Sequence, residues 1–217
     1  MSRAECFVFA GPSLDPAARA GGCRFLEPAA RGDIDTITRS EPPGSIVLAD
    51  GKFHQSLSVG HVEIRRALEQ GWRVWGVSSI GAIRAYELRE AGMRGYGRVY
   101  RLFFRFRDFQ DDEVAMLHGP GPGYAAASEP LVHMRFALHD LVRRHLLEQS
   151  KALAVLSELK ALWYGQRTLH TFAGLVCAAG SPSKQSGIRA RLARFDRYRV
   201  KQQDLASLLA ARPWSCR

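Results

Sequence analysis

The sequence has no CxxC pair and no hydrophobic run long enough to cross a membrane. Its cysteines, Cys6, Cys23, Cys177 and Cys216, lie far apart and suggest neither a disulfide framework nor a cysteine zinc site. The opening MSRAECFVFAG holds one Arg and an apolar stretch too short for a secretory signal. The longest later apolar stretch, FAGLVCAAG, is about half a membrane span. We therefore expect reduced thiols, a cytoplasmic location and no membrane partner.

A dinucleotide fingerprint and a P-loop are also missing. Gly11, Pro12 and Ser13 follow an apolar stretch and resemble a small anion-cradling loop, but their spacing fits neither nucleotide motif. The chain also lacks a recognition-helix signature and an aromatic-interleaved motif for single strands. We expect no cofactor and no nucleic-acid partner.

Positive charge is present in excess, and it is unevenly distributed. The net charge is +10, yet residues 1–129 carry 16 Lys/Arg and 16 Asp/Glu, whereas residues 130–217 carry 15 and 5. The stretch RARLARFDRYRVK, residues 189–201, is the densest part of this basic region. Such a surface is a solvated helix face, a docking surface for an acidic protein or, with less support, a nucleic-acid surface.

Apolar stretches alternate with amphipathic ones in the first half of the chain. This alternation predicts an α/β fold with a parallel sheet of about four to six strands flanked by helices. Asp15 and Ser58 are the expected caps of two of these helices. The expected strands lie within residues 4–11, 23–28, 44–51 and 72–79, and the expected helices within 14–21, 31–40, 58–71 and 80–92.

A Gly/Pro-rich loop at residues 119–123 separates this region from a run of helix-like segments that begins at Ser128. We expect an α/β core domain over residues 1–127 and a basic, all-helical C-terminal subdomain over residues 128–217. In a parallel sheet the ligand site lies at the carboxyl ends of the strands. The turns expected to meet there are residues 11–13, 28–33, 50–51 and 78–79.

Ser78 and Ser79 lie where the fourth strand leads into a helix. A serine at such a turn is exposed beside backbone N–H groups, as in the G-x-S-x-G motif of hydrolases. Ser79-Ile80-Gly81 matches only the second half of that motif, because Val77 stands where the first glycine would be. Ser79 is thus a candidate nucleophile, a binder of an anion or carbonyl, or a plain helix cap.

His54 and His61 follow the third strand and can reach the same edge of the sheet. A neutral imidazole is the natural base for a serine hydroxyl. Asp50, at the end of that strand, could orient such a histidine, cap a neighbouring amide or bind a cation. The alternative for each histidine is an ordinary surface or capping role, and Glu63 points to another helix face than His61.

A cluster of acids, Asp111, Asp112 and Glu113, precedes His118. Such clusters often cap a helix or strand. Asp50, Asp112 and His118 could instead form a site for Mg²⁺ or Mn²⁺, which prefer oxygen-rich ligands. We keep this metal site as an alternative only.

These stretches together resemble the TfuA-like family, in order along the chain. One position departs from the family pattern, since the family usually has Lys where this chain has Val62. The stretches that carry the resemblance are FAGPSL (9–14), PAARGD (28–33), IVLADGKFH (46–54), GHVEI (60–64), GVSSIGAIRAYEL (76–88), GMRGYGRVY (92–100), DDEVAMLHG (111–119) and SEPLVHMR (128–135).

The resemblance implies a role beside a YcaO protein, which uses ATP to activate a peptide backbone amide. TfuA-like partners are associated with the sulfur step that yields a thioamide, in ribosomal peptide natural products among other substrates. The implied partners are a YcaO cyclodehydratase-like protein, a ThiS-like sulfur carrier with a C-terminal thiocarboxylate, and the precursor peptide as a further candidate.

Release of sulfide from a thiocarboxylate is acyl transfer, which requires a nucleophile or activated water, a base and oxyanion donors. One hypothesis is a hydrolase-like enzyme in which Ser79 attacks and His61 or His54 takes the proton. In it, Asp50 orients the histidine, and N–H groups near Gly81 hold the oxyanion. A non-catalytic docking partner and a metal-dependent hydrolase are the alternatives. Expected substrate-binding residues are Gly11, Pro12, Ser13, Ser78, Gly81, Arg84, Asp112 and His118.

Overall fold

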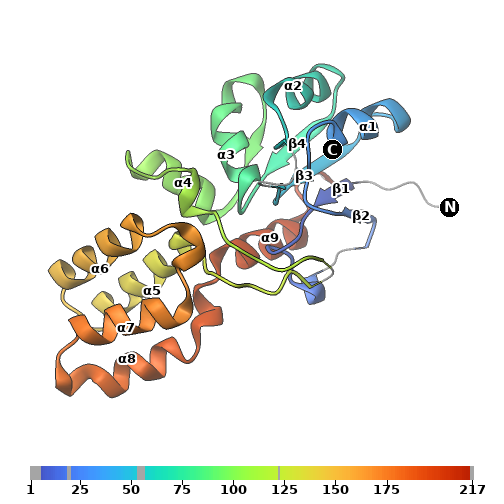
Figure 1. Cartoon of the computed structure of the whole chain (residues 1–217). Helices are drawn as coiled ribbons and strands as arrows, with labels where there is room; N and C mark the ends of the chain where they lie inside the picture. Colours follow the sequence, from blue (N-terminus) through green and yellow to red (C-terminus); the bar gives the residue numbers. More distant parts are fainter. Residues whose placement is uncertain (1–5, 19–20, 53–56, 122, 216–217) are drawn as a thin grey trace. The chain divides into compact units, whose positions relative to one another are not determined.

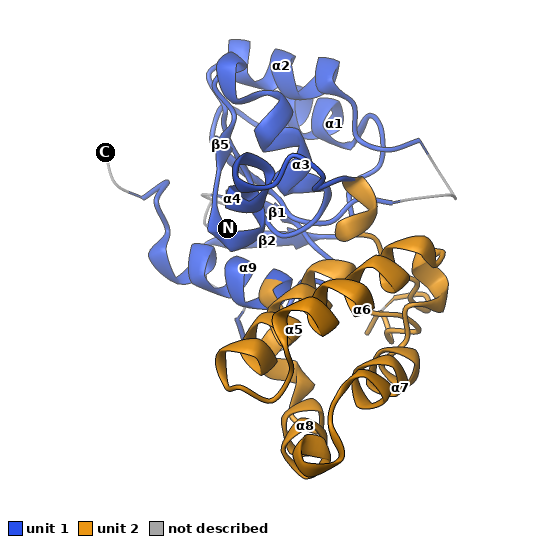
Figure 2. Cartoon of the chain, turned by 90° about the vertical axis from the view of Figure 1, so that its left-hand side faces the viewer, with its two compact units in different colours: residues 1–110, 201–217 blue, residues 111–200 orange. Residues whose placement is uncertain are grey.

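A computed structural model of the chain describes residues 6–18, 21–52, 57–121 and 123–215. These residues form two compact units. The first unit comprises residues 1–110 and 201–217, and the second comprises residues 111–200. Figure 2 shows them in different colours.

The first unit contains a five-stranded, all-parallel sheet, which confirms the expected α/β fold. Its strand order is β2-β1-β3-β4-β5. The order of the strands reverses between β1 and β3, so their carboxyl ends leave a crevice there, the usual ligand position in open α/β sheets. The strands are β1 (Cys6–Phe9), β2 (Cys23–Leu26), β3 (Ser45–Leu48), β4 (Arg73–Gly76) and β5 (Arg94–Gly95).

Helices cover both faces of this sheet, as Figure 1 shows. Because side chains alternate along a strand, Cys6 and Val8 of β1 face one side, where they pack with Val47 of β3. Leu205 and Leu208 of the last helix close this part of the core. The other face meets α3, since an added Cβ on Gly76 would lie 2.7 Å from the Cβ of Ala85.

The first four helical segments of the first unit follow its strands as expected, whereas α4 was not predicted and α9 was expected in the C-terminal subdomain. They are η1 (Pro16–Ala18), α1 (Asp33–Ser40), α2 (His61–Glu69), α3 (Ile80–Glu87), η2 (Arg89–Ala91), α4 (Gly97–Arg105) and α9 (Val200–Ala211). Asp15 caps η1 as predicted, because its Oδ1 accepts a hydrogen bond from the N–H of Ala17 at 2.9 Å.

Ser58 does not cap α2, in contrast to the prediction. The N-cap of α2 is Gly60, and the Ser58 hydroxyl donates to the Lys52 carbonyl instead. The buried carboxylate of Glu63 takes over the capping role, accepting from the N–H of Gly60 at 2.8 Å. It also accepts from the N–H groups of Gly32 and Ile34, so one carboxylate satisfies the starts of both α1 and α2.

The second unit is helical around its own core. Its helices are η3 (Asp111–Glu113), α5 (Leu131–Arg143), α6 (Gln149–Ala161), η4 (Tyr164–Gln166), α7 (Leu169–Ala179), η5 (Pro182–Lys184), α8 (Gln185–Leu192) and η6 (Phe195–Tyr198). Met134 and Leu141 of α5 pack in one buried cluster with Leu159 of α6, Phe172 of α7 and Ile188 of α8.

These compact units have other limits than the domains expected from sequence. The N-terminal part of the first unit ends at Gln110 rather than at residue 127. The C-terminal residues from Lys201 onwards also belong to the first unit. The reason is that α9 lies against the sheet, where Leu209 and Trp214 are buried with β1, β3 and β4 side chains.

Among the described helices, none combines the length and apolar character that a membrane crossing requires.

Candidate functional site

Loops from β1, β2, β3 and β4 meet at the carboxyl edge of the sheet. The Ala29 N–H donates to the Asp50 carbonyl at 2.9 Å, and the Lys52 N–H donates to the Ala29 carbonyl at the same distance. The N–H groups of Ser79 and Gly81 each reach the Ala49 carbonyl at 3.3 Å. The four expected turns therefore converge around the residues that follow β3.

Asp50 joins the loop after β1 to the end of β3. Its Oδ2 accepts from the N–H groups of Gly11 and Ser13, each at 2.8 Å, and its Oδ1 accepts from the Ser13 hydroxyl at 2.7 Å. The Asp50 side chain is almost completely buried. Buried carboxylates need such donors, so this geometry explains why an acid follows β3. The carboxylate holds a loop here and makes no hydrogen bond with a described histidine.

The start of α9 contributes to the same region, which the sequence did not reveal. The side chain of Gln202 donates to the Pro12 carbonyl at 3.0 Å. Asp204, one turn into the helix, accepts from the N–H of Val99 at 2.9 Å and from Arg98 at 3.2 Å. Burial raises the pKa of the Asp204 carboxyl, and these hydrogen bonds only partly offset that effect. The start of α9 is thus tied both to the loop after β1 and to the start of α4.

Ser78 has a left-handed backbone, with φ of 66°. Non-glycine residues rarely adopt this conformation, and it is concentrated at functional turns and clamps. Its hydroxyl is buried and donates to the Lys201 carbonyl at 2.7 Å. The signal that sequence analysis missed is Gly76-Val77-Ser78, because the G-x-S half of the hydrolase motif fits Ser78 rather than Ser79.

Ser79 is the N-cap residue of α3, but its side chain makes no capping hydrogen bond. The residue is 4% exposed. Its carbonyl accepts from the N–H groups of Ala82 and Ile83, while the N–H of Gly81 is directed to the Ala49 carbonyl. Gly81 therefore has no spare amide for an oxyanion. The N–H of Ile80, at the start of α3, has no oxygen partner among the described residues.

Glycine is required at position 81 by close packing. A Cβ at Gly81 would lie 1.7 Å from the Leu48 carbonyl oxygen, and one at Gly76 would lie 2.0 Å from the Gly81 carbonyl oxygen. Only the absence of side chains lets α3 approach β3 and β4 so closely. The S-x-G pattern thus reflects packing of this helix on the sheet.

His61 lies in a polar cluster with Arg84 and Glu87. Its Nε2 is 2.8 Å from Oε2 of Glu87, and Nη1 of Arg84 donates to the same oxygen at 2.7 Å. Arg84 also donates to the Val59 carbonyl, which joins α3 to the segment before α2. Glu87 is eight residues after Ser79, about 12 Å along the helix. Neither His61 nor Asp50 makes a hydrogen bond with Ser79 in the described part of the chain.

His54 lies in residues 53–56, outside the described residues. Val62 is 61% exposed and lines an open hollow of about 440 Å³ at the starts of α1 and α2. Arg31 and Arg66 lie in the lining as well. Since Glu63 already occupies the helix amides there, this hollow offers side chains rather than backbone N–H groups.

Asp112 and His118 belong to the second unit. Asp112 forms an ion pair at 2.7 Å with Arg167, a buried side chain that also donates to the carbonyls of Asp112, Leu159 and Leu162. His118 is exposed, and its Nδ1 lies 2.7 Å from the Gly119 carbonyl oxygen. Among the described His, Cys, Asp and Glu side chains, no group of three is arranged to hold a metal ion. The metal-dependent alternative therefore gains no support from the donor groups.

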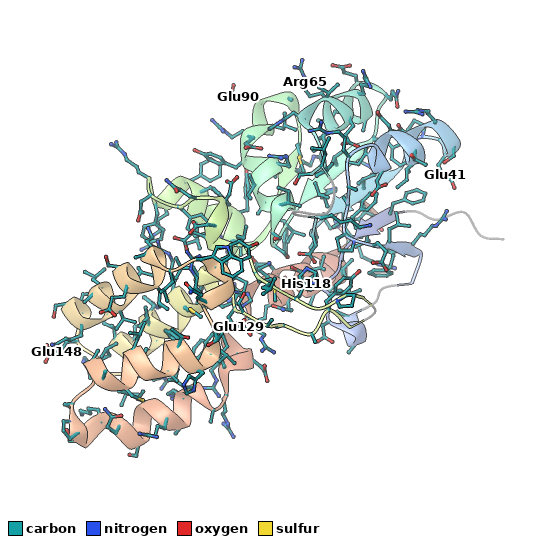
Figure 3. All side chains as sticks on the ribbon, viewed as in Figure 1. Glu41, Arg65, Glu90, His118, Glu129 and Glu148 are labelled. Carbon is teal, nitrogen blue, oxygen red and sulfur yellow. The ribbon has the colours of Figure 1, made fainter. Side chains whose placement is uncertain are left out.

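A second polar site in this unit was missed by sequence analysis. Glu129, labelled in Figure 3, is buried and lies 2.9 Å from Nδ1 of His133, while Arg199 donates to its other oxygen at 2.7 Å. Burial alone would raise the pKa of Glu129, but His133 and Arg199 together lower it below its ordinary value. Similarly, Glu113 is buried, and its two carboxylate oxygens accept from Nε and Nη2 of Arg135 at 2.8 and 2.6 Å.

Tyr198 and Asp140 form a further polar contact near η6. The Tyr198 hydroxyl donates to Asp140 at 2.7 Å. Burial and the neighbouring Asp140 raise the pKa of Tyr198 to about 12. Burial would raise the pKa of Asp140 too, but the Tyr198 bond and Arg144 lower it overall. These polar groups hold the helices together, since each buried charge has an opposite charge or a donor beside it.

Comparison with known proteins identifies the family. The model of the TfuA-like protein family matches residues 50–168, more than half of the chain. None of the curated proteins compared with the chain matches it. The matched region begins at Asp50, includes the serine turn and the Glu129–His133 pair, and ends at the cap of α7. The chain therefore belongs to the TfuA-like protein family, which gives it a general role in the YcaO-associated thioamide system.

Proposed function

We propose that the chain is a docking partner in peptide backbone thioamidation, which brings a thiocarboxylated sulfur carrier to a YcaO protein in the cytoplasm. The observation that carries this choice is the engagement of Asp50 by Gly11 and Ser13. His61 is similarly engaged by Glu87. With both groups bound elsewhere, the described residues supply no base and orienting acid for Ser79.

A basic groove in the second unit supports a docking role. Leu169 and Phe172 of α7, with Leu192 of α8, line a hollow of about 370 Å³. Arg189 lies in the lining, and Arg194 is exposed in the same basic stretch. Neither arginine forms an ion pair with another described residue. An apolar hollow with unpaired positive charge suits an acidic protein such as the proposed carrier.

A second candidate function is sulfide release at the serine turn, which the left-handed Ser78 favours. In this mechanism the Ser79 oxygen attacks the thioacyl carbon, a base takes the hydroxyl proton and hydrosulfide leaves. Water then hydrolyses the acyl-serine ester, which returns the free serine and a carrier carboxylate. His54 is the remaining candidate base, and the Ile80 N–H the remaining donor for the oxyanion. Direct attack by water is a variant of the same reaction.

One reconstitution distinguishes the two functions. Purified chain is mixed with the thiocarboxylated carrier, with and without the cognate YcaO protein, ATP and precursor peptide, and both sulfide and thioamide are measured. The docking role predicts no sulfide from chain and carrier alone, and normal thioamide formation by Ser79→Ala. It also predicts loss of thioamide formation when Arg189 and Arg194 are both changed to Glu.

Arg65→Glu is the matched control, because Arg65 is an exposed arginine that points away from α2 (Figure 3). It should support thioamide formation as the unchanged chain does. Sulfide released by the chain alone, and reduced on the order of 100-fold by Ser79→Ala, would establish the hydrolase-like function instead.

A further inference from the structure

Aromatic rings gather on the outside of α3 and α4 in the first unit. The ring of Phe104 lies 4.9 Å from that of Tyr86 and 5.2 Å from that of Tyr100, both in edge-to-face geometry. Phe104 is 57% exposed, although it is a large apolar side chain within a well-formed helix. We call this surface the aromatic–arginine patch; it comprises Tyr86, Arg89, Tyr100, Arg101, Phe104 and Arg105.

The fold does not need Phe104 for its own core. The neighbouring Phe103 packs against Phe109, with ring centroids 4.7 Å apart, and Val99 is the fully buried residue of α4. Phe104 packs against Tyr86 and Tyr100 at the surface, where its burial remains incomplete. Exposed aromatic residues of this kind are enriched at the centres of protein interfaces.

Positive charge surrounds the rings. The guanidinium carbon of Arg89 lies 4.8 Å from the centroid of Tyr86 and 6.0 Å from that of Phe104. Its carboxylate partner, Glu90, is 87% exposed in its side chain and 3.3 Å away. Arg101 and Arg105 are exposed and form no ion pair with another described residue. The guanidinium group of Arg105 lies over Phe106, at 5.6 Å from the ring centroid. The patch therefore presents, on the helix that carries the exposed Phe104, two arginines without an ion-pair partner among the described residues.

We infer that the aromatic–arginine patch docks a protein whose surface is acidic around an apolar recess. Tyrosine and arginine are enriched among interface hot spots, and phenylalanine is enriched in the cores of interfaces. Opposite charge would set the orientation of the partner. A single-stranded nucleic acid fits less well, because it requires open ring faces for its bases. Here Arg89 covers Tyr86, and Phe103 stacks on that same ring at 5.5 Å.

The partner that docks on this patch is the YcaO protein, an assignment that rests on the proposed function. A protein that brings two partners together needs two separate surfaces, and the basic groove of the second unit is proposed for the carrier. The patch supplies the other surface, on α3 and α4, within the region that the family model matches.

The test measures binding of the purified full-length chain to the cognate YcaO protein by biolayer interferometry. Phe104→Ala and the double change Arg101→Glu with Arg105→Glu should each raise Kd about 10-fold or more. Higher salt should weaken binding of the unchanged chain and have less effect on the double variant. Leu153→Ala and Arg65→Glu, at exposed positions outside the patch, should change Kd by about two-fold at most.

Three other outcomes would each contradict a different part of the proposal. If the unchanged chain does not bind the YcaO protein, both the proposed partnership and this use of the patch are wrong. If it binds but the patch variants bind equally well, with unchanged thermal unfolding, only the patch assignment is wrong. If a single-stranded oligonucleotide binds the chain and Phe104→Ala abolishes that binding alone, the patch is a nucleic-acid surface instead.

Discussion

Ser13 and Asp50 are joined twice, once through the Ser13 hydroxyl at 2.7 Å and once through its backbone N–H at 2.8 Å. The two residues are 37 positions apart in the chain, yet they meet because they follow β1 and β3, which are neighbouring strands of the parallel sheet. Their hydrogen bonds lie at the carboxyl edge of the sheet, where the strand order reverses between β1 and β3. The acid after β3 thus organises the loop after β1.

Asp50→Asn should lower the free energy of unfolding by about 1–3 kcal/mol. An amide group cannot accept from all three donors, so at least one N–H or hydroxyl of the loop loses its acceptor. Urea denaturation measures the change. Asp15→Asn is the control, because the asparagine oxygen can still accept from Ala17 at this exposed cap. Equal stability of the Asp50 variant and the unchanged chain would contradict the assigned role.

Ser78 offers a test of backbone strain. Ser78→Ala loses the hydrogen bond to Lys201 while keeping a side chain at φ of 66°, and should cost about 1 kcal/mol. Ser78→Gly loses the same bond but relieves the backbone, so it should be less destabilising than alanine. Chemical denaturation of both variants gives the comparison. A glycine variant less stable than the alanine variant would show that the left-handed turn carries no strain.

Gly81→Ala should destabilise the chain by about 2 kcal/mol or more, because the new methyl group would overlap the Leu48 carbonyl. The matched control is Gly174→Ala in α7, where an added Cβ meets no atom within 4 Å. That change should raise stability by about 0.5–1 kcal/mol through better helix propensity. Thermal unfolding of the two variants should therefore shift in opposite directions, and a shift in the same direction would contradict the packing argument.

The Glu129 site predicts a pH dependence with a defined sign. The pKa of Glu129 is lower in the folded chain than its ordinary value of 4.5. The stability that it contributes is therefore complete above this ordinary value and is lost as pH falls towards the folded pKa. Glu129→Gln should lower stability at neutral pH by about 3 kcal/mol, since His133 and Arg199 lose their carboxylate.

The difference between the Glu129→Gln variant and the unchanged chain should shrink as the pH is lowered. Unfolding measured by circular dichroism over a series of acidic pH values provides this comparison. Glu158→Gln, a surface carboxylate of α6, serves as the control and should leave the pH profile unchanged. A constant difference at every pH would mean that the carboxylate charge plays no part.

Much of the architecture followed from local patterns. The apolar runs of β1, β3 and β4 and the caps and glycines between them predicted a parallel α/β sheet, and the order of short motifs pointed to the TfuA-like family. The meeting of four turns at the carboxyl edge followed as well, because parallel strands must end on the same side. These features depend on residues close together in the chain or on the topology that they imply.

The partners of individual side chains were decided only by tertiary structure. The residues near Asp50 in the chain do not indicate that it binds Ser13. Likewise, the residues near His61 do not indicate that it contacts Glu87. Similarly, the C-terminal segment reads as one more helix, whereas α9 returns to the sheet and Lys201 accepts from Ser78. The physical reason is that periodicity reports which face of an element is buried, while hydrogen-bond partners depend on how distant elements pack.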